Sequence, residues 1–122
     1  MDRSLFLAGC VFAFTAVAGG AFGAHALSAR LPADRLATFE IAMRYQMYHA
    51  LGLIALSWAA SRWPGGVLHA AGWLFMGGIV VFSGTLIGIA LGGPRWLGAI
   101  TPLGGLGFLS GWLLAAWAVA RA

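Results

Sequence analysis

The feature that most constrains the fold is a series of long apolar runs separated by single arginines. The first run, residues 4–29, contains no charged residue between Arg3 and Arg30. About 20 apolar residues in a helix are enough to cross a hydrocarbon core about 30 Å thick. Hydrophobic residues make up 61% of the chain and charged residues 8%, whereas roughly a quarter of the residues in a soluble domain are charged. The sequence therefore predicts an integral membrane protein and excludes a soluble globular domain.

The pattern of these runs predicts an all-α fold, a four-transmembrane-helix bundle in a single integral membrane domain, residues 1–122. The expected spans cover residues 4–29, 42–61, 67–91 and 97–120. The Ala24-His25-Ala26 triplet resembles a signal-peptidase site, but the apolar run before it is longer than the h-region of a signal peptide. We therefore expect the first run to be retained as a span. Four spans place both termini on the same side of the membrane.

Residues 30–44 are the only segment with the character of a soluble protein. Pro32 and Asp34 are typical of a first helical turn. Apolar residues then recur at spacings of three and four, which indicates an amphipathic helix: Leu36, Phe39, Met43 and Met47. A helix running from Pro32 to Ser61 would be about 45 Å long. We therefore expect the second helix to be extended by an amphipathic interfacial segment.

The distribution of basic residues along the chain indicates which kinds of partner to expect. The net charge of +4 comes from seven basic residues, all arginines, against three acidic ones. A nucleic-acid-binding protein gathers its basic residues in one patch, whereas these arginines flank the apolar runs one at a time. The sequence predicts no nucleic-acid partner. The expected partners are the lipid bilayer and either other membrane proteins or further copies of the chain.

The stretch RYQMYH, residues 44–49, places a cation, two phenols, an amide and an imidazole within two helical turns. We expect Arg44 to pair with Glu40, one turn earlier in the helix. We also expect His49 to face the first span near His25, because these histidines end one span and begin the next. The full candidate cluster for binding a ligand comprises seven residues: His25, Glu40, Arg44, Tyr45, Tyr48, His49 and Thr101.

Three interpretations of this cluster remain open. The side chains can be structural anchors that hydrogen-bond the backbone, or they can bind a proton, a small molecule, a lipid headgroup or a quinone. The third interpretation is haem or metal ligation by His25 and His49. Metal sites commonly use more ligands than two histidines, so we predict neither a cofactor nor a metal and no catalytic residues.

Glycines at four-residue spacing predict close helix packing, because small residues let helix backbones approach. The third run contains Gly84, Gly88 and Gly92, and Gly20 belongs to a similar row in the first run. These four glycines are the expected helix-packing residues. They can serve contacts inside the bundle or a contact with a partner helix.

Five short blocks spread over most of the chain carry a family resemblance. They are GAFGAHAL (20–27), YQMYHAL (45–51), GWLF (72–75), FSG (82–84) and ITPLGG (100–105). In this order they resemble domain-of-unknown-function family 423, small bacterial membrane proteins related to animal transmembrane protein 256. The resemblance implies a four-helix membrane protein and little about activity.

The sequence shows no nucleophile–base pair, no carboxylate pair and no phosphate-binding loop. We therefore expect a protein that is not an enzyme: an accessory, assembly or small-subunit protein of the bacterial inner membrane that packs against membrane partners. The alternative is an oligomeric transporter or channel for ions or small molecules with a polar site near His25 and His49.

Overall fold

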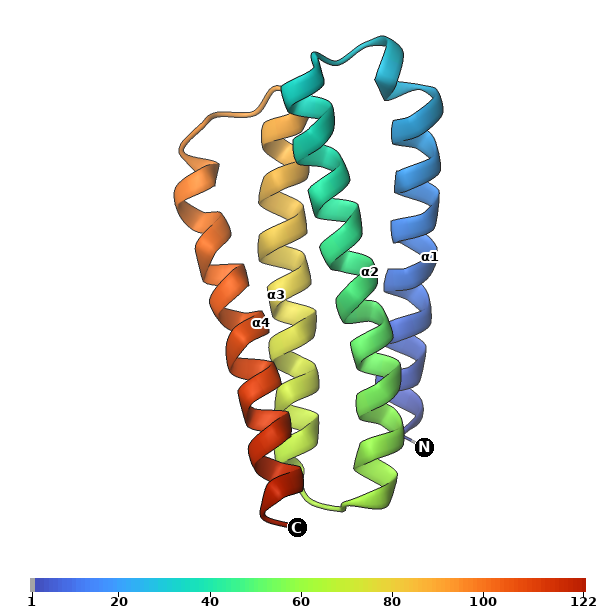
Figure 1. Cartoon of the computed structure of the whole chain (residues 1–122), viewed down its shortest axis with the longest axis vertical. Coiled ribbons are helices and arrows are strands. Elements are labelled where there is room, and N and C mark those ends of the chain that lie inside the picture. Colours follow the sequence, from blue (N-terminus) through green and yellow to red (C-terminus); the bar gives the residue numbers. More distant parts are fainter. Residues whose placement is uncertain (1) are drawn as a thin grey trace.

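The computed structural model describes residues 2–122 and consists of four long helices. They are α1 (Arg3–His25), α2 (Ala33–Arg62), α3 (Gly66–Ala90) and α4 (Leu97–Ala120), with a 3₁₀ turn, η1 (Leu27–Ala29), after α1 (Figure 1). No strand occurs among the described residues. The helices run up and down in alternation, so the N-terminal start of α1 and the C-terminal end of α4 lie at the same, lower end in Figure 1. The all-helical prediction is confirmed.

Three of the helices are long and apolar enough to cross a membrane: α1 together with η1, α3, and α4. Helix α2 is the longest, at 30 residues, but it does not meet this criterion. Four of its charged residues lie in its first half: Asp34, Arg35, Glu40 and Arg44. Of the four predicted spans, three are therefore supported by length and composition.

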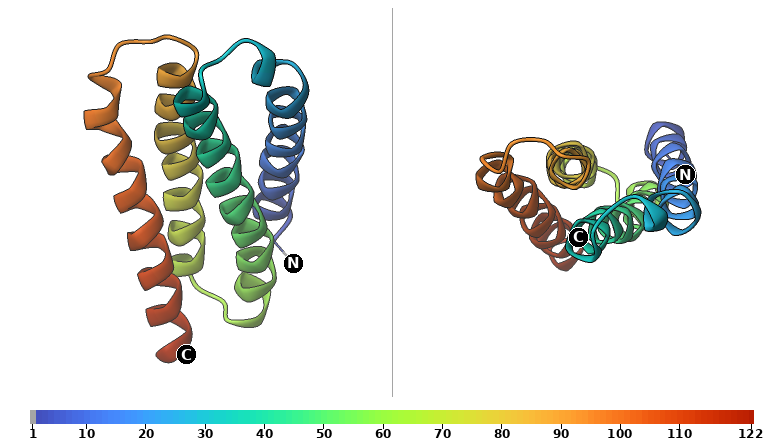
Figure 2. Two further views of the ribbon diagram at one scale, coloured as in Figure 1. Left: turned by 45° about the horizontal axis from the view of Figure 1, so that its top comes forward. Right: turned by 90° about the horizontal axis from the view of Figure 1, so that it is seen from above.

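The helices pack in chain order. Helix α1 packs on α2, α2 on α3, and α3 on α4, whereas α1 and α3 barely touch. Seen from above, the four helices form an open row with α1 and α4 at its two ends (Figure 2). Each end helix is therefore covered on one side only, and α2 and α3 form the middle of the molecule.

The predicted extension of the second helix is present as a continuous part of α2, and its position at the membrane interface stays a prediction. Helix α2 is continuous from Ala33 to Arg62, and its first half packs into the molecule. Phe39, Ala42 and Met43 are buried together with Leu27 and Ala90. The apolar stripe that indicated an interfacial helix is the surface through which α2 contacts its neighbours.

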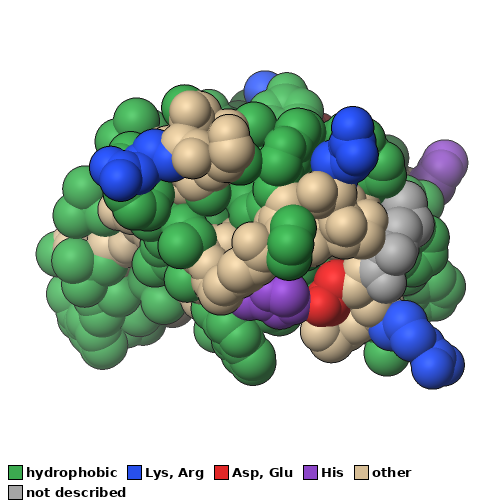
Figure 3. Space-filling view, turned by 90° about the horizontal axis from the view of Figure 1, so that it is seen from below, with side chains coloured by type: hydrophobic (Ala, Val, Ile, Leu, Met, Phe, Trp, Pro, Cys, Tyr) green, Lys and Arg blue, Asp and Glu red, His purple; other side chains and the backbone are tan. Residues whose placement is uncertain are grey.

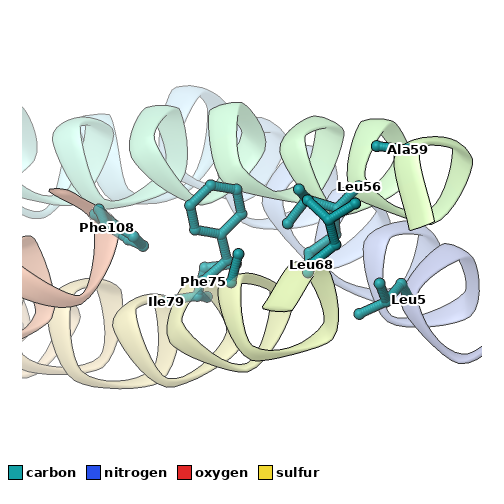
Figure 4. Close-up of a cluster of buried hydrophobic side chains, with 9 residues drawn as sticks. Leu5, Leu56, Ala59, Leu68, Phe75, Ile79 and Phe108 are labelled. Atoms are coloured by element: carbon teal, nitrogen blue, oxygen red, sulfur yellow. The ribbon is translucent and has the colours of Figure 1, made fainter. Parts of the chain in front are cut away.

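The larger core lies in the lower part of the molecule, where side chains from all four helices meet (Figure 4). Phe75 of α3 is fully buried near its centre, with Leu56 on the α2 side and Phe108 on the α4 side. Leu5 brings the start of α1 into the same cluster. Through this core, the end helices α1 and α4 both pack against the middle helices α2 and α3.

The predicted glycine row does not mark the close contacts of the bundle. A β-carbon at Gly20 or Gly84 would meet no atom within 4 Å. A β-carbon at Gly88 would lie 3.0 Å from Leu97, and Gly92 forms the turn after α3 with a positive φ of 103°. Within the bundle, the prediction is therefore wrong for Gly20 and Gly84, and Gly92 serves a turn.

The glycines that bring helices together are different ones. A β-carbon at Gly104 of α4 would lie 2.5 Å from the backbone nitrogen of Phe82 in α3. A β-carbon at Gly78 would lie 2.7 Å from the ring of Phe108 and 3.0 Å from the carbonyl oxygen of Gly104. The contact between α3 and α4 therefore depends on backbone approaching backbone.

Candidate functional site

His49 is the centre of the most organised polar site. It lies near the middle of α2 and is only 5% exposed. Its ring stacks on Phe108 with ring centroids 3.6 Å apart and an interplanar angle of 11°. Phe75 meets it edge-on, with centroids 5.0 Å apart and an angle of 83°. The imidazole is thus held between aromatic side chains of α3 and α4.

Both ring nitrogens of His49 have hydrogen-bond partners. The indole Nε1 of Trp112 donates to Nε2 of His49 at 3.0 Å. Nδ1 lies 2.8 Å from the backbone carbonyl oxygen of Tyr45. Because Nε2 accepts a hydrogen bond, the hydrogen-bond network assigns the proton to Nδ1, which donates to that carbonyl. His49 is therefore a neutral imidazole with one fixed tautomer.

This pairing bears on haem or metal ligation. A histidine ligand donates a lone pair from one ring nitrogen. In this structure the lone pair of Nε2 accepts the Trp112 hydrogen bond and Nδ1 carries the proton. Ligation by His49 would therefore require the Trp112 bond to break.

An apolar groove of about 280 Å³ opens beside His49 between α2, α3 and α4. Tyr45 stands at this groove and is 40% exposed, with its ring centroid 5.2 Å from that of Phe82. The lining is mostly aromatic or aliphatic: Tyr45, His49, Phe82, Gly105, Phe108, Leu109 and Trp112. Such a surface suits an apolar group better than an ion.

The structure does not bring His25 and His49 together. His25 is exposed at the upper end of α1. His49 is the seventeenth residue of α2, so it lies about 24 Å below the start of that helix at a rise of 1.5 Å per residue. It faces α3 and α4, not the first helix. The prediction of a shared His25–His49 site is wrong because α2 begins well before the expected span.

The predicted ion pair between Glu40 and Arg44 is also absent. Both residues are exposed on the outer side of α2. Within residues 2–122, the only ion pair joins Asp2 and His69. Tyr48 likewise points outward and is 53% exposed, with its ring centroid 5.5 Å from that of Tyr45.

Thr101, the last member of the predicted cluster, is buried between α3 and α4. Its hydroxyl lies 2.6 Å from that of Thr85 and also donates to the carbonyl oxygen of Leu97 at 3.2 Å. Helix α4 continues through Pro102 without a break. Thr101 is therefore part of the contact between two helices and is separate from the His49 site.

Sequence reasoning missed two polar partners. Gln46 is 6% exposed and donates from Nε2 to the carbonyl oxygen of Phe12 at 3.0 Å and to the Thr15 hydroxyl at 2.6 Å. Trp112 is the second, as the donor to His49. Its position was a usable signal, because tryptophan is enriched at the ends of membrane helices and Trp112 lies far inside one.

Asp2 and His69 form a second polar site at the lower end, where an acidic side chain lies against a histidine (Figure 3). The Asp2 carboxylate accepts hydrogen bonds from Ser4 Oγ at 2.7 Å and Leu5 N at 3.0 Å, and it pairs with His69 Nε2. The bonds from Ser4, Leu5 and His69 lower the pKa of Asp2 well below its usual range. The backbone nitrogen of Asp2 donates to the Ser57 carbonyl oxygen at 3.0 Å. This site fastens the start of α1 to α2 and α3.

Comparison with known proteins gives a consistent result. Residues 19–105 match a family described as "Protein of unknown function (DUF423)". The chain belongs to this family. The UPF0382 membrane protein YwdK of Bacillus subtilis is 41% identical over 113 residues, which cover 92% of each chain. A UPF0382 membrane protein of Staphylococcus saprophyticus is 46% identical over 112 residues, again covering 92% of each.

The match to the DUF423 family confirms the family resemblance that the short sequence blocks indicated. Its relatives are named as membrane proteins, in agreement with the three apolar helices. No solved structure matches the chain. The family description gives no activity.

Proposed function

We propose that α2 is a fourth membrane span and that both termini lie on one side of a bacterial inner membrane. The direction of the helices supports this. Helices α1 and α3 run in the same direction, so the chain must return from the upper to the lower end between them. Helix α2 makes that return, and at about 45 Å it is long enough to cross.

The polar side chains of α2 are compatible with a span because they face protein. Gln46, His49 and Ser57 are buried and hydrogen-bonded. Polar groups in a membrane are expensive unless they have such partners. Arg44 is exposed in the upper half of α2, and its long side chain can extend toward the lipid headgroups.

We further propose that the protein is a non-enzymatic accessory or assembly protein that packs against other membrane proteins or against a second copy. The observation that carries this proposal is that the buried polar side chains are hydrogen-bonded to other groups of the same chain. Among residues 2–122, all the buried polar side chains are hydrogen-bonded within the chain: Gln46, His49, Ser57, Ser83 and Thr101. The bonds of Gln46, Ser83 and His49 connect α2 to α1, α3 and α4, respectively. Thr101 connects α4 to α3, and Ser57 bonds within α2. The buried polar groups thus stabilise the packing of the helices.

The outer faces of the two end helices are where a partner would bind. Phe14 of α1 is 74% exposed and Leu113 of α4 is 73% exposed. Because the row is open, these faces are free of the chain's own helices along their length. A partner helix packing there would extend the row.

A photo-crosslinking amino acid at Phe14 or Leu113 tests this proposal in the native membrane. We expect discrete protein adducts of defined mass from at least one of these positions, identified by mass spectrometry. Trp73, exposed on the inner helix α3, is the matched control and should give fewer protein adducts. Lipid adducts alone from both end helices would contradict the proposal. A pure homo-oligomer with ion flux in liposomes would favour a transporter instead.

A further inference from the structure

Two arginines from distant parts of the sequence line one cleft at the upper end of the molecule. Arg35 comes from the first turn of α2, and Arg95 comes from the connection between α3 and α4. The cleft has a volume of about 310 Å³. Asp34, Thr38, Ile89 and Gly93 complete its lining. The basic side chains at the lower end, in contrast, are spread around its edge (Figure 3).

The positions of these two guanidinium groups leave them available to a ligand. Neither arginine forms an ion pair with any of residues 2–122, and Asp34 forms none either. A β-carbon at Gly92 would lie 3.5 Å from Nη1 of Arg35, so this guanidinium lies over the turn after α3. The cleft holds two positive charges against one negative charge, which favours an anion.

The simplest structural role for Arg35 would be to cap the carbonyl groups at the end of α3. Three of the last four carbonyls of α3 already have partners. The oxygens of Ile87, Gly88 and Ile89 accept hydrogen bonds from Leu91, Gly93 and Gly92, at 3.0, 2.7 and 3.1 Å. The guanidinium of Arg35 is therefore not needed to cap these three carbonyls.

The ends of the apolar helices α3 and α4 predict that the cleft lies near the lipid headgroups. Helix α3 ends at Ala90 and α4 begins at Leu97, so the connection between these two apolar helices lies at a membrane surface. Trp96, next to Arg95, is 64% exposed, and tryptophan is enriched at headgroup level. Helix α2 also begins here without a side-chain cap, so the N–H groups of its first turn add positive potential.

We infer that the cleft between Arg35 and Arg95 binds a phosphate group, carried by an anionic phospholipid or by a free phosphate compound. Arginine donates two parallel hydrogen bonds to phosphate oxygens, and two arginines can hold one phosphate from two sides. The site would tie the start of α2 to the α3–α4 connection. It does not depend on whether the chain binds a protein partner.

Lipid binding by the full chain in a mild maltoside detergent tests this inference. Native mass spectrometry and the thermal unfolding midpoint are measured with phosphatidylglycerol, with phosphatidylcholine and with inorganic phosphate at constant ionic strength. We expect retained phosphatidylglycerol and a raised midpoint. The double variant Arg35→Gln/Arg95→Gln should bind at least about tenfold more weakly, because it loses the charge-assisted bonds.

The matched control is Arg3→Gln/Arg62→Gln, which removes the same charge at the lower end. A charge-conserving Arg35→Lys/Arg95→Lys variant separates paired hydrogen bonding from simple charge attraction and should also bind more weakly. If the double glutamine variant does not fold, Arg95→Gln alone replaces it, since Arg95 is exposed on a connection.

An arginine-dependent rise in the midpoint with inorganic phosphate, but not with phosphatidylglycerol, would assign the site to a free phosphate compound. Equal losses in the lower-end control, full binding by the lysine variant, or equal responses to phosphatidylglycerol and phosphatidylcholine would overturn the inference.

Discussion

The contact between α3 and α4 differs from the part of the α1–α2 contact that lies above Gly9. In the first, glycines bring backbone against backbone, as at Gly104, where a β-carbon would lie 2.5 Å from the Phe82 nitrogen. In the second, Gly19 faces the side chain of Met43, and Gln46 supplies hydrogen bonds to Phe12 and Thr15. A backbone cannot move aside as a flexible methionine can. The α3–α4 contact is therefore limited by shape at Gly104, whereas the α1–α2 contact is supported by polar bonds around Gln46. The α1–α2 contact is close-packed lower down, at Gly9, where a β-carbon would lie 2.8 Å from the Ala50 carbonyl oxygen.

The largest effect is expected at Gly104. The Gly104→Ala variant places a methyl group against the α3 backbone and should cost about 3 kcal/mol of unfolding free energy, at the upper end for overpacking. Denaturant unfolding in mixed micelles, followed by circular dichroism, measures it. Gly105→Ala is the control, because a β-carbon there meets nothing within 4 Å. Equal stability of the two variants would show that the α3–α4 contact is not limited by shape at Gly104.

The next effect is expected at Gln46. The Gln46→Leu variant removes both hydrogen bonds to α1 and should lower the free energy of unfolding by about 1–2 kcal/mol, near the upper values for polar contacts between membrane helices. The same unfolding measurement is used. Thr85→Val, which removes the bond to Thr101 in the α3–α4 contact, should cost less. A larger loss at Thr85 would reverse the assignment of polar support to the α1–α2 contact.

A smaller effect is expected at Gly19. In the Gly19→Ala variant the new methyl group meets the flexible side chain of Met43, which can change rotamer. The cost should be below about 1 kcal/mol. The double variant Gly19→Ala/Met43→Leu identifies the coupling between the two residues. A loss as large as that of Gly104→Ala would show that the α1–α2 contact is limited by shape at Gly19 as well.

The smallest effect is expected at Asp2, which fastens the start of α1. Since its pKa is lowered by Ser4, Leu5 and His69, its carboxylate stabilises the folded state above the unfolded pKa, and this contribution is lost as the pH falls toward the folded value. Asp2→Asn should therefore lower stability at pH 7 by less than about 1 kcal/mol. The difference from the unsubstituted protein should narrow below about pH 4. Thermal scans at both pH values measure it, and a difference that stays constant with pH would rule out this link.

The sequence by itself determined the class of the protein and much of its helical framework. Uncharged runs of 20 or more residues leave few alternatives to membrane helices, because an unpaired backbone cannot be buried in lipid. The expected spans at 67–91 and 97–120 agree with α3 and α4 within one residue. The short blocks around Gly20, Tyr45 and Ile100 correctly indicated the family.

Only the tertiary structure decided which way each helix faces. In a soluble helix a polar face marks the outside, but in lipid both the outside and the packed face are apolar. Gly84 and Gly78 therefore look alike in the sequence, although Gly84 faces open space and Gly78 meets Phe108. In the same way, His49 could have met α1 or α4, and its contact with Trp112, 63 residues away, was settled by the rotation of α2 about its axis.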